Sequence, residues 1–401
     1  MPRALPSCIR GRMLRKTMIP NSTESETRSL PLLPAPAAAV LTDSIVFHWE
    51  KQSFRTDLIF VLPVALCLCA GLAAGHQAAG MIAAGGAATI GYGAKQNIDD
   101  SQLLPMIFAT LGMAFSIFLG MVVGHDNFVL VGVTALWGFG YGMLTTREGG
   151  YGWVGLQSVV MLVVGSAFPA SAKAAAIRAL VLLAGGAIQV LSSSLILRLF
   201  GELRAHVLAL ASYIQAEQAA LRVAMLNAAA SWKKGNLEDS ALPYSIRLAV
   251  TLAVSTLIYQ QMHFASGYWI PMTAVMVLRP GIADTANRAI ARTLGTVVGA
   301  WLISIFVAHF TPSPTWLVVF TVLFAWLSYG TLNVNYALFA LCLTGYIVFL
   351  LSLDRLPENE IAHRRAVATA IGGSLALMVR LVVIYRWRKR LRESGGATVM
   401  G

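Results

Sequence analysis

Three arginines follow a short apolar segment in the second half of the chain and are the clearest candidates for binding chemistry. Arg279 ends that segment, and Arg288 and Arg292 lie four residues apart, so their guanidinium groups share one face of a helix. A guanidinium group binds a carboxylate through two parallel hydrogen bonds, which suits such a cluster to collecting organic anions. The alternative interpretation is that these charges only mark the cytoplasmic side of a membrane protein.

Two short apolar segments interrupted by glycine or proline are candidates for the centre of a binding site. Segment 266–279 contains Pro271, and segment 78–93 is rich in glycine. Broken helices free backbone amides and carbonyls, which must then face a cavity or a ligand rather than lipid. The predicted lining residues are Tyr268, Trp269 and Thr273 from the later segment and Thr89 and Tyr92 from the earlier one. Alternatively, the aromatic residues form an interfacial belt and the glycines only allow close helix packing.

Other chemical signals are missing from the sequence. It contains no glycine-rich phosphate loop, no HExxH motif, no dinucleotide fingerprint and no metal-ligand cluster. The acidic residues avoid the apolar segments, with Asp57 and Asp284 at their edges, which leaves few candidates for proton coupling. We therefore expect no cofactor and no enzymatic activity, and neither an ATP-driven pump nor an ordinary hydrolase.

The composition indicates the elements that position these residues. Of the 401 residues, 57% are hydrophobic and only 12% are charged, whereas a soluble domain carries about 25% charged residues. Apolar runs of about 20 residues, the length of a membrane-spanning helix, recur along the chain. This pattern predicts an all-α polytopic membrane protein with about twelve transmembrane helices, arranged as two six-helix halves in the same orientation. The expected spans are 57–75, 78–93, 104–124, 127–145, 152–171, 175–198, 246–263, 266–279, 293–310, 315–332, 334–353 and 366–385.

The formal net charge of +12 is concentrated at the ends of the apolar runs and in the two tails. This distribution fits membrane orientation rather than nucleic-acid binding. With twelve spans, most basic loops and both tails fall on one side, so we predict that the N- and C-termini are both cytoplasmic. Lys173 and Arg178 oppose the charge rule near the outer end of the sixth span.

A polar segment between the halves predicts a cytoplasmic linker helix with one apolar stripe, broken at Gly235-Asn236. A helix lying in the membrane interface is the alternative. The expected parts of the chain are a disordered basic cytoplasmic tail (1–45), the first six-span half (46–198), the linker helix (199–243), the second six-span half (244–386) and a basic cytoplasmic tail (387–401).

The stretch from Tyr268 to Gly299 resembles the signature of the fusaric-acid-resistance-like family, which includes bacterial aromatic-acid exporters. The resemblance covers roughly residues 244–386, and the first half fits by layout alone. It implies a six-span unit used in pairs that exports organic anions such as aromatic carboxylates, together with a periplasmic adaptor protein in relatives from two-membrane bacteria. The residues that carry the resemblance are Tyr268, Trp269, Pro280, Thr285, Arg288, Arg292, Gly295, Thr296, Gly299, Asn335, Tyr336, Thr344, Arg364, Arg365 and Gly372.

Together these observations predict an inner-membrane permease that exports aromatic or other organic carboxylic acids. In this hypothesis the broken second and eighth spans form the central site, and Arg279, Arg288 and Arg292 collect the anion on the cytoplasmic side. The expected partners are membrane lipid, small organic anions, a periplasmic adaptor and a second copy in a homodimer, but no nucleic acid. Two alternatives stay open: a passive organic-anion channel, and a non-transporting membrane scaffold or envelope-related protein.

Overall fold

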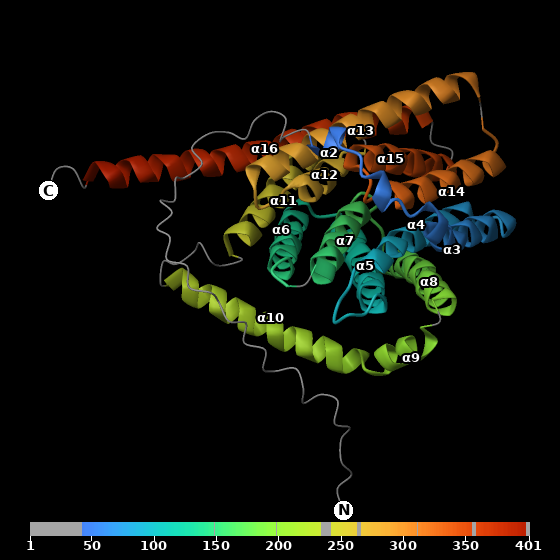
Figure 1. Cartoon of the computed structure of the whole chain (residues 1–401), viewed down its shortest axis with the longest axis horizontal. Coiled ribbons are helices and arrows are strands. Elements are labelled where there is room, and N and C mark those ends of the chain that lie inside the picture. The colour runs from blue at the N-terminus through green and yellow to red at the C-terminus, as the bar shows by residue number, and fades with distance from the viewer. Residues whose placement is uncertain are drawn as a thin grey trace, which may run out of the picture. The chain divides into compact units, whose positions relative to one another are not determined.

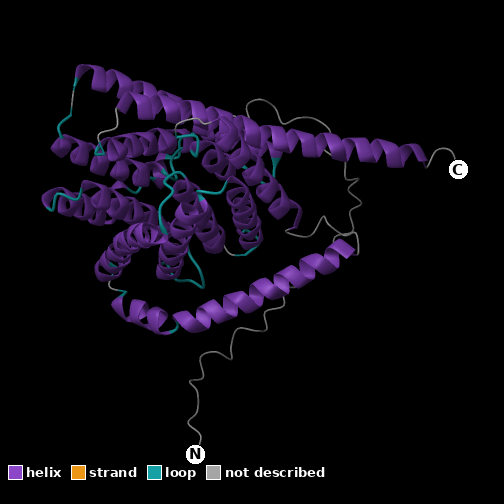
Figure 2. Ribbon diagram, turned by 180° about the vertical axis from the view of Figure 1, so that it is seen from behind, coloured by secondary structure: helices purple, strands orange, loops and turns teal. Residues whose placement is uncertain are grey.

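The computed structural model describes residues 42–147, 149–197, 199–233, 242–262, 266–310, 312–354 and 358–397. Within these residues the regular structure is helical and contains no strand (Figures 1 and 2). Residues 1–41 lie outside the described residues, and every element below belongs to the unit Ala37–Gly401. Most of the expected tail 1–45 therefore lies outside the described residues, and its last residues form the short helix α2 (Thr42–Ile45).

The first half contains a helix at each of its six expected spans. Local sequence explains where some of them begin: Asp126 accepts hydrogen bonds from the backbone N–H groups of Phe128 and Val129 before α6, and Ser171 accepts one from Ala174 before α8. A 3-10 turn, η1 (Trp49–Lys51), precedes these helices, and η2 (Tyr92–Lys95) continues the second of them. The helices are α3 (Phe54–Ala73), α4 (Gln77–Gly91), α5 (Leu103–Val123), α6 (Asn127–Leu144), α7 (Gly149–Ser166) and α8 (Ala172–Ile196).

The second half also has a helix at each expected span, but two of them are longer than predicted. The polar stretch before residue 293 continues the same helix back to Ile282, and the last helix includes most of the expected tail 387–401, up to Ala397. The helices are α11 (Leu242–Met262), α12 (Trp269–Val277), α13 (Ile282–His309), α14 (Pro314–Thr331), α15 (Tyr336–Ser352) and α16 (Glu358–Ala397).

Several of these helices have the length and hydropathy of a membrane span. Among the described residues, eight helices are long and apolar enough to cross a membrane: α3, α5, α6, α8, α11, α13, α14 and α16. The other four at expected spans are α4, α7, α12 and α15, of which α12 has only nine residues. The chain is thus a helical, multi-pass membrane protein, and the count of twelve spans stays a prediction.

The segment between the halves forms two helices rather than the single one expected, α9 (Phe200–Leu208) and α10 (Leu210–Lys233). The predicted break at Gly235-Asn236 lies outside the described residues. Two polar contacts tie these helices to the bundle: Ser101 donates a hydrogen bond to Glu202 over 2.6 Å, and Arg147 pairs with Glu217. The Ser101 hydrogen bond, supported by His206, holds the pKa of the Glu202 carboxyl below its usual value.

The helices pack in a pattern that connects distant parts of the sequence. In the first half, α5 packs on α7 and α8, and α4 packs on α3 and α8; in the second, α13 packs on α15 and α16, and α12 packs on α11 and α16. Across the halves, α6 packs against α11 and α3 against α14 (Figure 1). Glycine permits the closest approaches: a Cβ at Gly372 of α16 would lie 2.5 Å from the carbonyl oxygen of Ile270 in α12.

Candidate functional site

Two arginines of α13 enclose one tyrosine at the start of α15. The guanidinium carbon of Arg288 lies 3.6 Å from the centre of the Tyr336 ring, and Arg292 donates a hydrogen bond to the Tyr336 hydroxyl over 3.4 Å. The four-residue spacing puts both arginines on the face of α13 that packs against α15. Arg292 is only 2% exposed, so its charge lies inside the helix bundle rather than at its surface.

A third arginine lies deep in the bundle, about two turns after the start of α16. Arg365 is 1% exposed, and its guanidinium carbon lies 4.2 Å from the centre of the Trp269 ring of α12. Its Nε donates a hydrogen bond to the hydroxyl of Thr344 in α15 over 3.3 Å. A cation over the face of a buried tryptophan is stabilised by the ring's quadrupole, but that contact does not neutralise its charge.

The polar groups around these arginines are incompletely satisfied. Arg292 Nε and Arg365 Nη1 are buried without a hydrogen-bond acceptor among the described residues, and the hydroxyls of Thr273 and Thr296 also lack partners there. No carboxylate of the described residues forms an ion pair with Arg292 or Arg365. Burying a charged donor without a partner is costly, which makes this cluster the candidate functional site.

The later of the two predicted segments lies next to these arginines. Tyr268 and Trp269 are 6% and 5% exposed, and their ring centres lie 4.9 Å apart. They are therefore interior residues rather than an interfacial belt. Thr273 is buried beside Gly372 of α16. Arg279 is half-buried after the end of α12, where its backbone N–H and carbonyl both bond the Thr285 hydroxyl.

The earlier segment is placed differently. Helix α4 packs mainly on α3 and α8, and α12 packs mainly on α16 and α11, so the two broken segments do not form one joint site. The Thr89 hydroxyl bonds the Gly85 carbonyl of its own helix over 2.9 Å. Tyr92 bonds Ser328 over 2.6 Å and lies edge-on to Phe339, whose ring contacts Tyr336. Tyr92 thus reaches the arginine cluster through one aromatic ring, whereas no such contact links Thr89 to it.

A separate buried ion pair involves an acidic residue that the sequence places at a span edge. Asp57, in the first turn of α3, is 1% exposed and lies 2.9 Å from the Lys95 amine of η2. Asp57 also accepts a hydrogen bond from Ser53 over 2.5 Å, and Lys95 donates one to the Tyr329 carbonyl over 2.7 Å. This cluster is satisfied internally, unlike Arg292 and Arg365.

Sequence reasoning did not place Arg365 and Tyr336 among the binding residues. Both belong to the residues that carry the family resemblance, which is the signal that could have identified them. Arg365 directly precedes the expected span 366–385, because hydropathy does not locate where that helix begins. Since α16 begins at Glu358, Arg365 is inside a helix and faces its neighbours.

Comparison with known proteins agrees with the location of this site. Residues 252–379 match the family described as fusaric acid resistance protein-like. The chain is 31% identical over 156 residues to the uncharacterized protein ORF2 of Neisseria gonorrhoeae, over 38% of this chain and 36% of that one. It is 29% identical over 156 residues to the uncharacterized protein YhfK of Escherichia coli K12, over 39% of this chain and 22% of that one.

A similarity to the uncharacterized protein slr1298 of Synechocystis reaches 27% identity over 143 residues, 35% of this chain and 19% of that one. The matches thus span between about a fifth and about a third of the relatives' length. No solved structure matches the chain. Arg288, Arg292, Tyr336, Thr344 and Arg365 all fall inside the matched region. The match confirms the resemblance expected from sequence: residues 252–379 are similar to the fusaric acid resistance protein-like family.

Proposed function

We propose that the protein is an inner-membrane permease for organic anions, built from two six-span halves in the same orientation. The packing pattern supports the two halves because the most extensive contacts recur at corresponding places. Helix α5 packs on α7 and α8 as α13 packs on α15 and α16, and α4 packs on α8 as α12 packs on α16. The contact of α6 with α11 likewise corresponds to that of α14 with α3.

The orientation proposed from the basic residues puts both termini in the cytoplasm. In that orientation the end of the bundle where α13 begins faces the cytoplasm, and the end where α16 begins faces the opposite side. Arg279 and Arg288 would then meet an anion arriving from the cytoplasm, Arg292 would hold it inside the bundle, and Arg365 would lie further along toward the outside.

One observation carries the anion specificity: Arg292 and Arg365 are buried and have no carboxylate partner among the described residues. A carboxylate can accept two parallel hydrogen bonds from a guanidinium, which would satisfy the donors that now lack acceptors. The rings of Trp269 and Tyr336 lie against guanidinium groups of this site. These faces favour a planar, aromatic carboxylate over a compact inorganic anion.

Transport into proteoliposomes tests this function. We expect the full chain to move radiolabelled benzoate down its gradient, and Arg292→Lys and Arg365→Lys each to lower the initial rate at least about tenfold, since lysine keeps the charge but loses the planar donor pair. Arg204→Lys on the exposed surface of α9 is the matched control and should transport normally. Normal rates in both buried-arginine variants would contradict the proposal.

The energy source is a separate part of the proposal. We propose that export uses the proton gradient or the gradient of the anion itself. Imposing a pH difference across the same vesicles separates the two, because a proton-coupled carrier accumulates benzoate faster than the unaided diffusion of benzoic acid measured in protein-free vesicles. A steady current that follows voltage without any pH gradient would assign the same site to a passive channel.

A further inference from the structure

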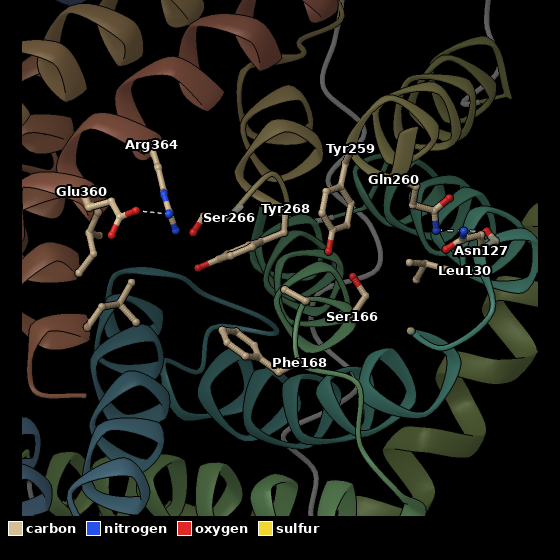
Figure 3. Close-up of a pocket in the computed structure, with 14 residues that line it drawn as sticks. Asn127, Leu130, Ser166, Phe168, Tyr259, Gln260, Ser266, Tyr268, Glu360 and Arg364 are labelled. Atoms are coloured by element: carbon tan, nitrogen blue, oxygen red, sulfur yellow. Dashed lines mark hydrogen bonds and ion pairs between the residues drawn. The ribbon is translucent and has the colours of Figure 1, made fainter. Parts of the chain in front are cut away.

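A cavity of about 490 Å³ lies at the end of the bundle where α16 begins. Its walls come from the ends of α7, α11 and α15 and from the starts of α6, α12 and α16. Figure 3 shows Arg364, Glu360 and Tyr268 toward one side of this cavity and Tyr259 and Gln260 toward the other. The volume falls within the range of about 300–1,000 Å³ typical of small-molecule sites.

The lining combines aromatic surfaces with one cation. The ring centres of Phe168 and Tyr268 lie 6.1 Å apart, and Tyr259 contributes a third aromatic side chain. Arg364 is the guanidinium that lines the cavity, and it forms an ion pair with Glu360 one turn earlier on α16. Their side chains are 32% and 47% exposed, so the pair is open to exchange with a solute. An exposed pair of this kind contributes at most about 1 kcal/mol.

The cavity adjoins the buried arginine site. Tyr268 lines the cavity and packs on Trp269, and Trp269 covers the guanidinium of Arg365. Arg364 and Arg365 are consecutive, and successive side chains on a helix point about 100° apart. One guanidinium therefore faces the cavity and the next faces the interior, with the pair Tyr268–Trp269 between the two spaces.

We propose that this cavity is a second binding site, which holds an aromatic monocarboxylate next to the buried site. The carboxylate binds Arg364 in place of Glu360, and the aromatic ring lies against Phe168, Tyr268 or Tyr259. Glu360 stays beside the bound ligand, so a second carboxylate on the ligand would be repelled; the site selects monocarboxylates. This inference rests on the proposed function, since the cavity would be the binding position at the outer end of the proposed transport path.

Thiol labelling tests binding without any need for transport. Gln260→Cys places a thiol in the cavity wall of the full chain in lipid nanodiscs, in a background where Cys8 and Cys69 are alanine. Benzoate should slow the reaction of this thiol with a small methanethiosulfonate reagent, and the neutral isostere benzamide should not. Arg204→Cys on the exposed face of α9, labelled in the same background without the cavity thiol, is the control and should react equally with and without benzoate.

Two charge variants locate the carboxylate. Arg364→Gln should raise the benzoate concentration for half-maximal protection at least about tenfold, because a charge-assisted hydrogen bond is lost. Glu360→Gln should lower it by about twofold to fivefold, because the competing ion pair is removed. Phthalate, with two carboxylates, should protect more weakly than benzoate in the unaltered cavity and as well as benzoate in Glu360→Gln.

Unchanged protection in Arg364→Gln, or equal protection by benzamide, would overturn this assignment. So would an absence of protection in a chain that transports benzoate at its normal rate. Protection that depends on Arg364 in a chain without benzoate transport would instead uphold the cavity site and refute the permease. The two proposals can therefore fail independently.

Discussion

Replacing Arg365 by methionine should make the protein more stable and abolish its transport. Methionine has a similar length, fills irregular space in a core and carries no charge. The substituted side chain would lie between Trp269 and Thr344, where a 1% exposed guanidinium now has one hydrogen bond of 3.3 Å and one aromatic face at 4.2 Å. The opposite effects on stability and transport separate a binding role from a structural one.

The size of the stability change follows from these contacts. A guanidinium has five N–H donors, and desolvating its charge costs several kcal/mol. The Trp269 contact offsets about 2 kcal/mol of this desolvation cost, and the single charged hydrogen bond offsets about 1.5 kcal/mol. Replacing incompletely paired buried charges by apolar side chains stabilises proteins by about 1–4 kcal/mol. We expect about 2 kcal/mol in favour of Arg365→Met without ligand.

Thermal unfolding in nanodiscs, followed by tryptophan fluorescence, measures this change with and without benzoate. Benzoate at about 100 times its dissociation constant should stabilise the unsubstituted protein by about 2.7 kcal/mol and the variant by much less, which reverses their order. Transport by the variant should fall by about two orders of magnitude, as expected for about 3 kcal/mol of lost binding. Arg204→Met on the exposed face of α9 should change neither quantity.

The reasoning is refuted if Arg365→Met unfolds well below the unsubstituted protein and benzoate stabilises neither. In that case the guanidinium would be a structural element that Trp269 and Thr344 satisfy on their own. Loss of transport alone would not rescue the argument, since a misfolded protein also loses transport.

Three further predictions concern the scaffold. Asp57→Asn should destabilise the protein by about 3–5 kcal/mol because Lys95 then lacks its buried partner. The double variant Asp57→Leu with Lys95→Met should recover most of that loss in the same thermal assay. Gly372→Ala should cost about 1–3 kcal/mol because its Cβ meets the α12 backbone, whereas Gly373→Ala, with nothing closer than 3.4 Å, should be neutral or mildly stabilising. The carboxyl of Glu202 has a lowered pKa, so its contribution to folding stability is present above the carboxyl's unfolded-state pKa and is lost as the pH falls through the lowered value. The protection of α9 amides against hydrogen exchange should therefore fall over that acidic interval and stay constant near pH 8.

The helices were predictable because their signal is local. Lipid requires runs of apolar residues, and each run expected from hydropathy contains a helix in the structure. The length of α13 and α16 was not predictable in the same way, because a helix can continue out of the apolar region through polar residues. The polar start of α13 follows Pro280 and Gly281 and contains no further proline or glycine before Gly295, which is a signal for one continuous helix.

The partners of the binding residues depend on packing between distant segments, and hydropathy carries no information on that. Sequence alone singles out Trp269, but it does not reveal that the guanidinium over its ring belongs to Arg365, nearly a hundred residues away. We expected α4 and α12 to face each other because both segments are short and interrupted by glycine or proline. Similar irregularity fits corresponding positions in two repeats, and corresponding helices of a repeat need not touch.

The cations of the proposed path come from one half of the protein only. When Thr110-Leu111-Gly112 is aligned with Thr293-Leu294-Gly295, the residue that corresponds to Arg292 is Ala109. The contact pattern of the two halves is alike, but α5 buries alanine where α13 buries an arginine. The first half instead contributes uncharged lining residues, such as Phe168 in the cavity at the end of the bundle where α16 begins. A single anion path through the second half, supported by the first, is therefore expected. Ala109→Arg would add a buried charge without the tyrosine that accompanies Arg292, and should destabilise the protein rather than create a second path.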